Sequence, residues 1–365
     1  MAGYWYPTAF TTWNEEETQA AIKRVLASGR LTMGEETFEF EKELAVYNKR
    51  KHAICVNSGS SANLIGIAAL HHKRPIRTAV APALAWSTTY APLAQHGIKF
   101  KLLDCDASWN AQPYKGPPVD LLVGCSILGN PARFDLQEPD HYHWLFNDNC
   151  ESLGAHIYNK PIGSYGDIAT LSFYFSHQLS AVEGGAVLTD DDELADLCRM
   201  LRDHGMTRSF KKAETFEEEF DFKLFGYNVR TTDLYSAIGR VQLRHVDAQR
   251  PARRGNWYYF NERTSRLPIT MAHCNPGFNP FGVQFILHDP RRRRELAYAL
   301  RAESIDCRMP VGGSFRLATY GKDAYYDPTP NADKIHRSGM FLGVGTFEIC
   351  DRIDKAVEIM KIVLS

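Results

Sequence analysis

Short apolar runs recur through the first half of the chain, and several are separated by segments long enough to hold a helix. The strand-like runs are RTAVAPALAW, IKFKLLDCD, VDLLVGCSILG, YHWLFNDNC, DIATLSFYF and GGAVLTD. Parallel strands need a crossover of about a dozen residues or more, usually a helix, whereas antiparallel strands can follow a tight turn. The pattern therefore predicts an α/β fold with a mostly parallel central sheet flanked by helices on both faces.

Helical patterns lie on both sides of this alternating region. NEEETQAAIKRVLASG starts with a capping-box-like pair, Asn14 and Glu17, and stops at Gly29, and EETFEFEKELAVY follows as a second helix. The last part of the chain combines the strand-like runs GVQFILHD and IDCRMP with the helical runs RRRRELAYALRAES and CDRIDKAVEIMKIVLS. We expect a large domain over residues 1–250, with an N-terminal helical segment, and a smaller C-terminal α/β domain over residues 251–365.

Composition argues against several classes of function. A formal net charge of −1 gives no global field that would attract nucleic acid or an anionic membrane. No apolar run approaches the ~20 residues that span a bilayer, and MAGYWYPTAF lacks the layout of a secretory signal, so we expect a cytoplasmic protein. The 8 cysteines form no C-x-C or C-x-x-C pair, which predicts no metal site, iron–sulfur cluster or disulfide framework.

The stretch NSGSSANL follows a strand-like run and opens a helical pattern. Gly59 lets the backbone approach a ligand closely. Ser60 and Ser61 offer hydroxyl and amide groups at the start of a helix, where the helix dipole favours an anion. The stretch could therefore hold a phosphate. Small polar residues also cap many helices, so plain helix capping is the alternative.

Two more candidates follow strand-like runs. Asp148 ends YHWLFND, and ligands of an open parallel sheet bind at the carboxyl ends of its strands, so this carboxylate could keep a ring nitrogen protonated. Trp86 follows RTAVAPALA and could lie flat against a planar ring. The alternatives are a loop cap for Asp148 and a core or interface position for Trp86.

His177 ends the strand-like run SFYFS, and it completes a series of phosphate cradle, aromatic ring, acid and histidine. This series resembles the fold-type I enzymes of pyridoxal phosphate, and specifically the sugar aminotransferase family called DegT/DnrJ/StrS. The resemblance covers nearly the whole chain. It is carried by YPTAFTTWNEEETQAAIKRVLASGRLTMG, CVNSGSSANL, PALAWSTTY, LGNP, DNCESLGA, SFYFSH, EGGAVLTDD and GYNVRTTDLYSAIGRVQL.

The resemblance implies a role for each matched residue. Asp148 would contact the pyridine nitrogen of the cofactor, and Trp86 would cover a face of its ring. The phosphate-binding positions are matched by Ser60, Ser61 and Ser172. No metal is implied.

The resemblance also implies a second subunit. Asn228, in GYNVR, matches an asparagine that reaches the cofactor phosphate from the neighbouring chain, so a homodimer with shared active sites is expected. Arg208 and Arg230 could hold the diphosphate of a nucleotide, because arginine pairs well with phosphate oxygens. Either arginine could equally be a surface ion-pair partner.

In the aminotransferases of this family, the position of His177 is a lysine that bonds covalently to the cofactor aldehyde. An imidazole cannot make that bond stably, so the amine form, pyridoxamine 5′-phosphate, can persist. Histidine can still move protons near neutral pH. The swap marks a subgroup of the family, the nucleotide-sugar 3-dehydratases of dideoxysugar biosynthesis. His177 and Asp148 are then the expected catalytic residues.

The activity so implied is removal of the C3 hydroxyl from a nucleotide-linked 4-keto-6-deoxyhexose, with GDP-4-keto-6-deoxy-D-mannose as the first expectation and glutamate regenerating the amine. Two alternatives remain. One is a nucleotide-sugar aminotransferase that uses a lysine from elsewhere, and the other is an inactive binding protein with the same fold. Two departures, Gln178 in place of a second histidine and the segment GMFLGVG, are expected to bear mainly on the sugar pocket.

Overall fold

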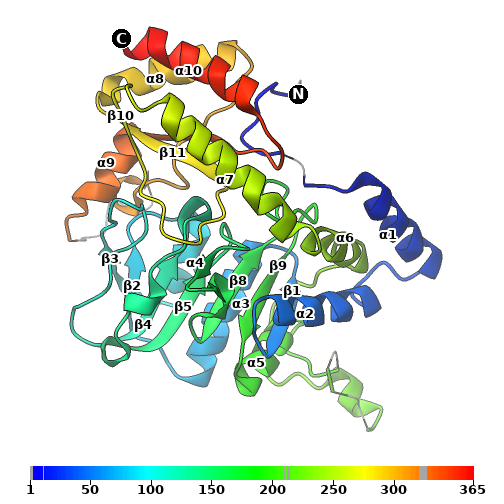
Figure 1. Cartoon of the computed structure of the whole chain (residues 1–365). Coiled ribbons are helices and arrows are strands. Elements are labelled where there is room, and N and C mark those ends of the chain that lie inside the picture. Colours follow the sequence, from blue (N-terminus) through cyan, green and yellow to red (C-terminus); the bar gives the residue numbers. More distant parts are fainter. Residues whose placement is uncertain (1–2, 11, 209, 212–213, 320–326) are drawn as a thin grey trace.

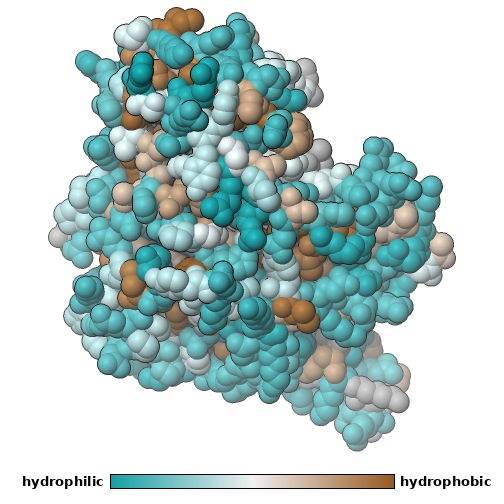
Figure 2. All heavy atoms as spheres, in the orientation of Figure 1, coloured by the Kyte–Doolittle hydropathy of each residue, from teal (hydrophilic) through white to brown (hydrophobic). Residues whose placement is uncertain are grey.

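The computed structural model describes residues 3–10, 12–208, 210–211, 214–319 and 327–365 (Figure 1). A large sheet with its helices occupies one half of the molecule, and a small sheet with α8 and α10 occupies the other. The face shown in Figure 2 is mostly hydrophilic, with small, separate apolar patches. In the part of the chain that the structure describes, no helix has the length and apolar character needed to cross a membrane.

The large sheet has seven strands in the order β1-β9-β8-β5-β4-β2-β3. All neighbouring pairs from β8 to β3 are parallel, and β9 runs antiparallel to both β1 and β8. The predicted mostly parallel sheet is therefore confirmed. The strands are β1 (His52–Val56), β2 (Thr78–Pro82), β3 (Lys99–Leu103), β4 (Val119–Cys125), β5 (Tyr142–Asp148), β8 (Ile168–Ser172) and β9 (Gly185–Thr189).

Helices cover both faces of this sheet, because successive strand residues point to opposite sides. In β1, Ile54 packs in the core with α3 (Gly59–Lys73), α4 (Ser87–Gln95) and α5 (Asp192–Arg202). Its neighbour Cys55 packs on the other face with α2 (Glu35–Tyr47) and α6 (Asp233–Leu243). Strands that are apolar on both sides therefore need no alternation in their sequence.

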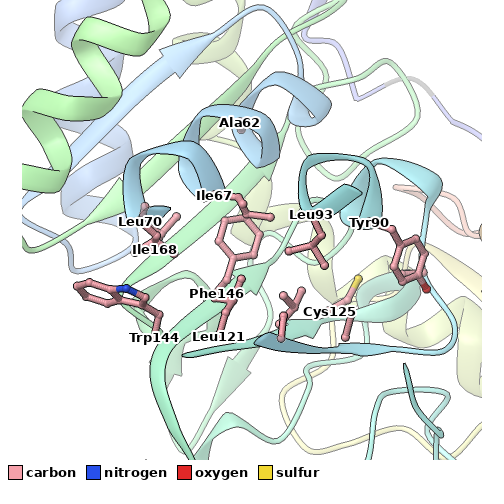
Figure 3. Close-up of a cluster of buried hydrophobic side chains, with 14 of the residues drawn as sticks. Ala62, Ile67, Leu70, Tyr90, Leu93, Leu121, Cys125, Trp144, Phe146 and Ile168 are labelled. Atoms are coloured by element: carbon pink, nitrogen blue, oxygen red, sulfur yellow. The ribbon is translucent and has the colours of Figure 1, made fainter. Parts of the chain in front are cut away.

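Helix α3 lies along the sheet, and Figure 3 shows its Ile67 and Leu70 against side chains of the strands, among them Phe146 and Ile168. Its apolar residues are nearly all buried, so the helix has no long polar face. A short hairpin, β6 (His156–Ile157) and β7 (Lys160–Pro161), contributes Ile157 to a further core with β4 and β5. The first helix, α1 (Glu15–Ser28), packs on α6 and starts and ends at the expected caps.

The small sheet consists of β10 (Ile269–Met271), β11 (Gly282–Leu287) and β12 (Gly339–Gly343), all antiparallel. It shares a core with α8 (Arg293–Ala302) and α10 (Cys350–Leu364), and Tyr6 and Phe10 from the start of the chain join that core. Helix α9 (Pro330–Ser338) packs beside β11 and β12.

The long helix α7 (Val246–Arg263) runs between the two halves (Figure 1). The domain boundary expected between residues 250 and 251 falls inside this helix. The strand expected at IDCRMP does not form. Ile305 and Arg308 make only isolated bridges, to Tyr6 and Phe341.

Candidate active site

A cavity of about 300 Å³ opens at the carboxyl ends of the parallel strands, between the large sheet and the small-sheet half. Five of the expected site residues line it: Ser60, Trp86, Asp148, Ser172 and His177. The other lining residues are Ser58, Gly59, Asn63, Thr88, Cys125, Leu128, Cys150, Glu151, Tyr174, Ser176, Glu183, Phe281, Arg308, Met309, Val311 and Phe341. The structure thus brings together side chains from both halves of the molecule.

The first turn of α3 forms one wall. Ser58 caps this helix, because its side chain accepts a hydrogen bond from the Ser61 N–H at 3.1 Å. A Cβ atom added at Gly59 would lie 2.6 Å from the Ser172 Cβ, so only glycine lets the helix start approach the end of β8 this closely. Ser60 lines the cavity, but Ser61 does not.

This wall fits a phosphate group. A helix start with uncapped N–H groups attracts an anion. The hydroxyls of Ser60 and Thr88 lie 3.1 Å apart at its edge, and Ser172 adds another hydroxyl from the end of β8. In contrast, the Ser61 hydroxyl accepts a hydrogen bond from the Ser58 hydroxyl at 3.0 Å. Ser58 and Ser61 therefore form the helix cap, and the hydroxyls of Ser60, Thr88 and Ser172 could hold a phosphate beside it.

Asp148 is held by a network that fixes its carboxylate. It is 3% exposed, and its Oδ2 accepts hydrogen bonds from Asn63 Nδ2 at 2.9 Å and from Thr89 Oγ1 at 2.7 Å. Thr170 Oγ1 in turn donates to Asn63 Oδ1 at 2.7 Å, which orients the amide. The carboxylate can therefore face a protonated ring nitrogen without moving. Asn63 and Thr89 were missed from the sequence, because their roles depend on partners far along the chain.

Trp86 stands just before α4 and is 55% exposed, with its ring on the cavity. An indole that is anchored by its backbone and open on one side offers a surface for stacking a planar ring. The structure therefore places Trp86 outside the core of the chain, which contradicts the core position considered from the sequence but does not bear on an interface position. An acid, an open aromatic ring and a phosphate cradle together fit a pyridine ring that bears a phosphate.

His177 follows β8 in a tight turn, where its N–H donates to the Tyr174 carbonyl. The imidazole lies between the rings of Tyr174 and Phe281, at centroid distances of 5.9 and 5.4 Å. Its Nδ1 is buried and has no hydrogen-bond partner within the described ranges. Burial, and secondarily the charge of Arg253, lowers the pKa of His177 to about 4. At neutral pH the ring is uncharged and can accept a proton.

Glu151 is a cavity residue that sequence reasoning missed. Its Oε2 accepts a hydrogen bond from the Leu128 N–H at 2.9 Å, and burial raises its pKa to about 7. Glu183 also lines the cavity, and burial raises its pKa too. Arg308 is the only lysine or arginine that lines the cavity within the described part of the chain. It comes from the IDCRMP run, which predicts only a strand.

Three expected residues lie elsewhere. Arg208 and Arg230 line a second cavity of about 550 Å³ with Asp203, and Arg230 forms an ion pair with Asp203. Arg208 lies over the ring of Phe220, 5.1 Å from its centroid. Asn228 is bridged through its backbone to Asp203. Within one chain, none of the three reaches the cavity of His177.

Gln178 does not line the cavity either. It is 1% exposed, and its Nε2 donates to the carbonyls of Glu151 at 2.6 Å and Asn279 at 3.1 Å. The expectation that this departure acts on the sugar pocket is not supported by a direct contact. The segment GMFLGVG forms β12 and contributes Phe341 to the lining.

Comparisons with known proteins agree with this geometry. Residues 13–360 match the family model for the DegT/DnrJ/EryC1/StrS aminotransferase family. The GDP-4-keto-6-deoxy-D-mannose 3-dehydratase of Yersinia pseudotuberculosis is 34% identical, over 98% of this chain and 98% of that protein. The Escherichia coli enzyme of that name, solved with bound hydrated PLP, superposes with a TM-score of 0.91 at 33% identity, covering 98% of this chain and 100% of that chain. A structure of GDP-4-keto-6-deoxymannose-3-dehydratase with a trapped PLP-glutamate geminal diamine also gives 0.91, at 32% identity and with 97% and 100% covered.

Proposed function

Because this chain belongs to the DegT/DnrJ/EryC1/StrS aminotransferase family, we propose that it is a nucleotide-sugar 3-dehydratase dependent on pyridoxal and pyridoxamine 5′-phosphate. Its substrate is a nucleotide-linked 4-keto-6-deoxyhexose. The first candidate is GDP-4-keto-6-deoxy-D-mannose, the sugar in the names of the similar 3-dehydratases. One observation carries the proposal. The cavity presents His177 where the family's aminotransferases use lysine, and its described lining contains no lysine.

When bound, pyridoxamine phosphate supplies an amine that condenses with the C4 ketone and a ring that can take up an electron pair. Asp148 holds the ring nitrogen in its protonated form, which makes electron uptake easier. Ser60 and Ser172 bind the phosphate at the start of α3, and Trp86 covers one face of the ring. Asn63 and Thr89 keep the carboxylate of Asp148 in register with that nitrogen.

His177 acts as the base and then as the acid. With a pKa of about 4, the neutral imidazole accepts a proton from the carbon next to the cofactor amine. The imidazolium so formed is a strong acid in this buried position. It passes its proton to the C3 hydroxyl, which can then leave as water. One side chain on one face of the cavity can therefore serve both steps.

Arg308 receives the amino donor. Glutamate brings two carboxylates into a cavity that is otherwise lined by the acids Asp148, Glu151 and Glu183, so a cation is needed to bind it. A guanidinium pairs with a carboxylate through two parallel hydrogen bonds. The glutamate complex of the relative supports this use of the same fold.

The second cavity belongs to a shared site in a homodimer. Arg208, Arg230 and Asn228 do not reach the cavity of their own chain, so we propose that they complete the cavity of a neighbouring copy, where the arginines bind the nucleotide diphosphate. The protein works in the cytoplasm, where nucleotide sugars are made.

A direct experiment tests the activity. Purified protein is mixed with pyridoxal phosphate, glutamate and GDP-4-keto-6-deoxymannose, and 2-oxoglutarate and the sugar product are followed by mass spectrometry. We expect His177→Asn to lose at least about 100-fold in rate while the cofactor still binds. His273→Asn, which changes an exposed histidine outside the cavity, should retain the activity.

The alternatives give different results. In His177→Lys, borohydride should fix the cofactor to the new lysine. If borohydride fixes the cofactor to a lysine of the unmodified protein, the chain is an aminotransferase. If the unmodified protein binds the cofactor weakly and turns nothing over, it is a binding protein. Comparing GDP-, CDP- and dTDP-linked sugars then identifies the nucleotide.

A further inference from the structure

Arg253 is a buried cation that has no counter-ion among the described residues. It lies on α7, is 2% exposed, and makes a single long hydrogen bond, from Nη1 to the Pro280 carbonyl at 3.4 Å. Its Nη2 is buried without a partner, and burial alone lowers its pKa to about 10, with no carboxylate opposing that effect among the described residues. A buried charge is normally paired, so its retention here calls for a reason.

Three consecutive residues connect Arg253 to His177. The Pro280 carbonyl accepts from Arg253, and the ring of Phe281 packs on the imidazole of His177 at a centroid distance of 5.4 Å. The Asn279 carbonyl accepts from Gln178, the residue next to His177. The charge of Arg253 is therefore close enough to disfavour a second positive charge on the imidazole, and it lies outside the cavity lining.

The same place holds several unsatisfied polar atoms. His177 Nδ1, Gln178 Oε1, Asn279 Oδ1 and Arg253 Nη2 are all buried, and none has a hydrogen-bond partner in the part of the chain that the structure describes. Buried polar groups are rarely left unpaired, and ordered water usually satisfies them. Since Nδ1 is buried, Nε2 is the nitrogen that can serve the cavity. A proton on Nδ1, satisfied by an ordered water, leaves Nε2 free to accept.

We propose that Arg253 is a positioning residue for the reaction, a cation held outside the cavity that keeps the imidazole of His177 uncharged except while it carries a proton between substrate atoms. This rests on the proposed function, in which His177 takes a proton and then gives it up. On the cavity side, the titratable and charged groups are Cys125, Asp148, Cys150, Glu151, Tyr174, Glu183 and Arg308. Arg253 is the charge on the opposite side, and it favours release of the proton.

The test measures the titration of His177 by NMR in the cofactor-loaded protein, without substrate. Arg253→Met removes the charge and keeps most of the volume, and Arg253→Lys keeps the charge. Arg254→Met is the matched control, because Arg254 neighbours Arg253 but lies against Tyr258 and Phe278. We expect the midpoint of His177 to rise by about one pH unit in Arg253→Met only.

The acid limb of the kcat–pH profile should move in the same direction in Arg253→Met and stay in place in Arg253→Lys. A folded Arg253→Met protein with an unchanged His177 midpoint would show that Arg253 only anchors the Pro280 carbonyl. If Arg253→Met does not fold, a His177 midpoint near 6.5 in the unmodified protein would equally overturn the proposal. The NMR result does not depend on turnover, so it stays informative even if the dehydratase assay fails.

Discussion

Two regions of the molecule differ in how many of their side chains find contacts within a single chain. One is the cavity at the carboxyl ends of the strands, and the other is the segment 214–230. In the cavity, Asp148 has three hydrogen-bond donors, from Asn63, Thr89 and the Cys150 backbone. In the segment 214–230, by contrast, four phenylalanines are exposed: Phe216 78%, Phe220 56%, Phe222 59% and Phe225 99%. The stretch around η5 (Glu217–Phe220) projects away from the large sheet (Figure 1).

This difference indicates which parts of the site are preorganised. The carboxylate of Asp148, proposed to face the cofactor ring, is fixed by contacts inside one chain, so it needs no partner to be in position. The groups proposed to hold the nucleotide stand on a surface with several exposed aromatic rings, which is typical of a protein interface. The comparison predicts that changes in the cavity act on chemistry, whereas changes in the segment act through assembly.

The largest effect is expected from Asp148→Asn. The amide cannot keep the ring nitrogen of the cofactor protonated, so the rate should fall by about 1,000-fold or more while the fold persists. Asp167→Asn is the control, because Asp167 is a partly buried aspartate that precedes β8 at the opposite end of the strands, where it accepts from the Leu145 N–H. Steady-state kinetics and cofactor absorbance measure both. Equal losses of rate in the two variants would show that Asp148 has no specific role at the ring nitrogen of the cofactor.

Phe225→Asp tests the other region. Phe225 is almost fully exposed, so the change should leave the stability of an isolated chain nearly unchanged. If the segment lies in a dimer interface, a buried carboxylate there should shift the protein toward monomer and lower activity about 10-fold at low protein concentration. Light scattering gives the mass, and Tyr298→Asp, on another exposed ring, is the control. A monomeric parent protein with full activity would contradict the shared site.

The sequence was sufficient for features that depend on neighbours in the chain. The capping pair Asn14 and Glu17, the parallel sheet and the acid at the end of β5 all follow from local pattern and from where parallel strands end. The resemblance to a known family supplied the combination of Asp148, Trp86 and His177, which no single stretch would have justified.

Residues that act through distant partners could not be found in this way. Burial raises the pKa of Glu151, and that burial cannot be read from the sequence. Arg308 reaches the cavity from the other half of the molecule. Because the sequence of α7 is mostly polar, it does not indicate that the guanidinium of Arg253 is buried. The run IDCRMP predicts a strand, but it forms only isolated bridges at Ile305 and Arg308. A short run does not show whether a partner strand is free to pair with it.

Glu151→Gln should change how stability depends on pH. The folded protein raises the pKa of Glu151 from 4.5 to about 7, so it favours the protonated acid. The stability that this group contributes is present below its unfolded pKa and is lost as the pH rises through 7. Between about pH 5 and about pH 8, the unmodified protein should therefore lose up to about 3 kcal/mol in its free energy of unfolding through this group.

Urea unfolding at several pH values measures this loss, and Glu151→Gln should show a flatter profile. Glu358→Gln, at an exposed position on α10, should keep the profile of the unmodified protein. A Glu151→Gln profile parallel to that of the unmodified protein would mean that the carboxyl is charged at neutral pH. Water would then reach this carboxyl in the cavity.

The smallest effect is expected from Gln178→His, which restores the second histidine of the related dehydratases. The Gln178 amide donates to two buried carbonyls, those of Glu151 and Asn279, and a neutral imidazole can donate to only one. One carbonyl left unpaired should cost about 1 kcal/mol of stability. Since the side chain lies outside the cavity, the ratio of kcat/KM between GDP- and dTDP-linked sugars should change by less than about twofold. A larger change would mean that the substitution shifts the loop of Glu151 and so alters the contacts with the sugar. The preorganised region would then extend beyond the residues that line the cavity.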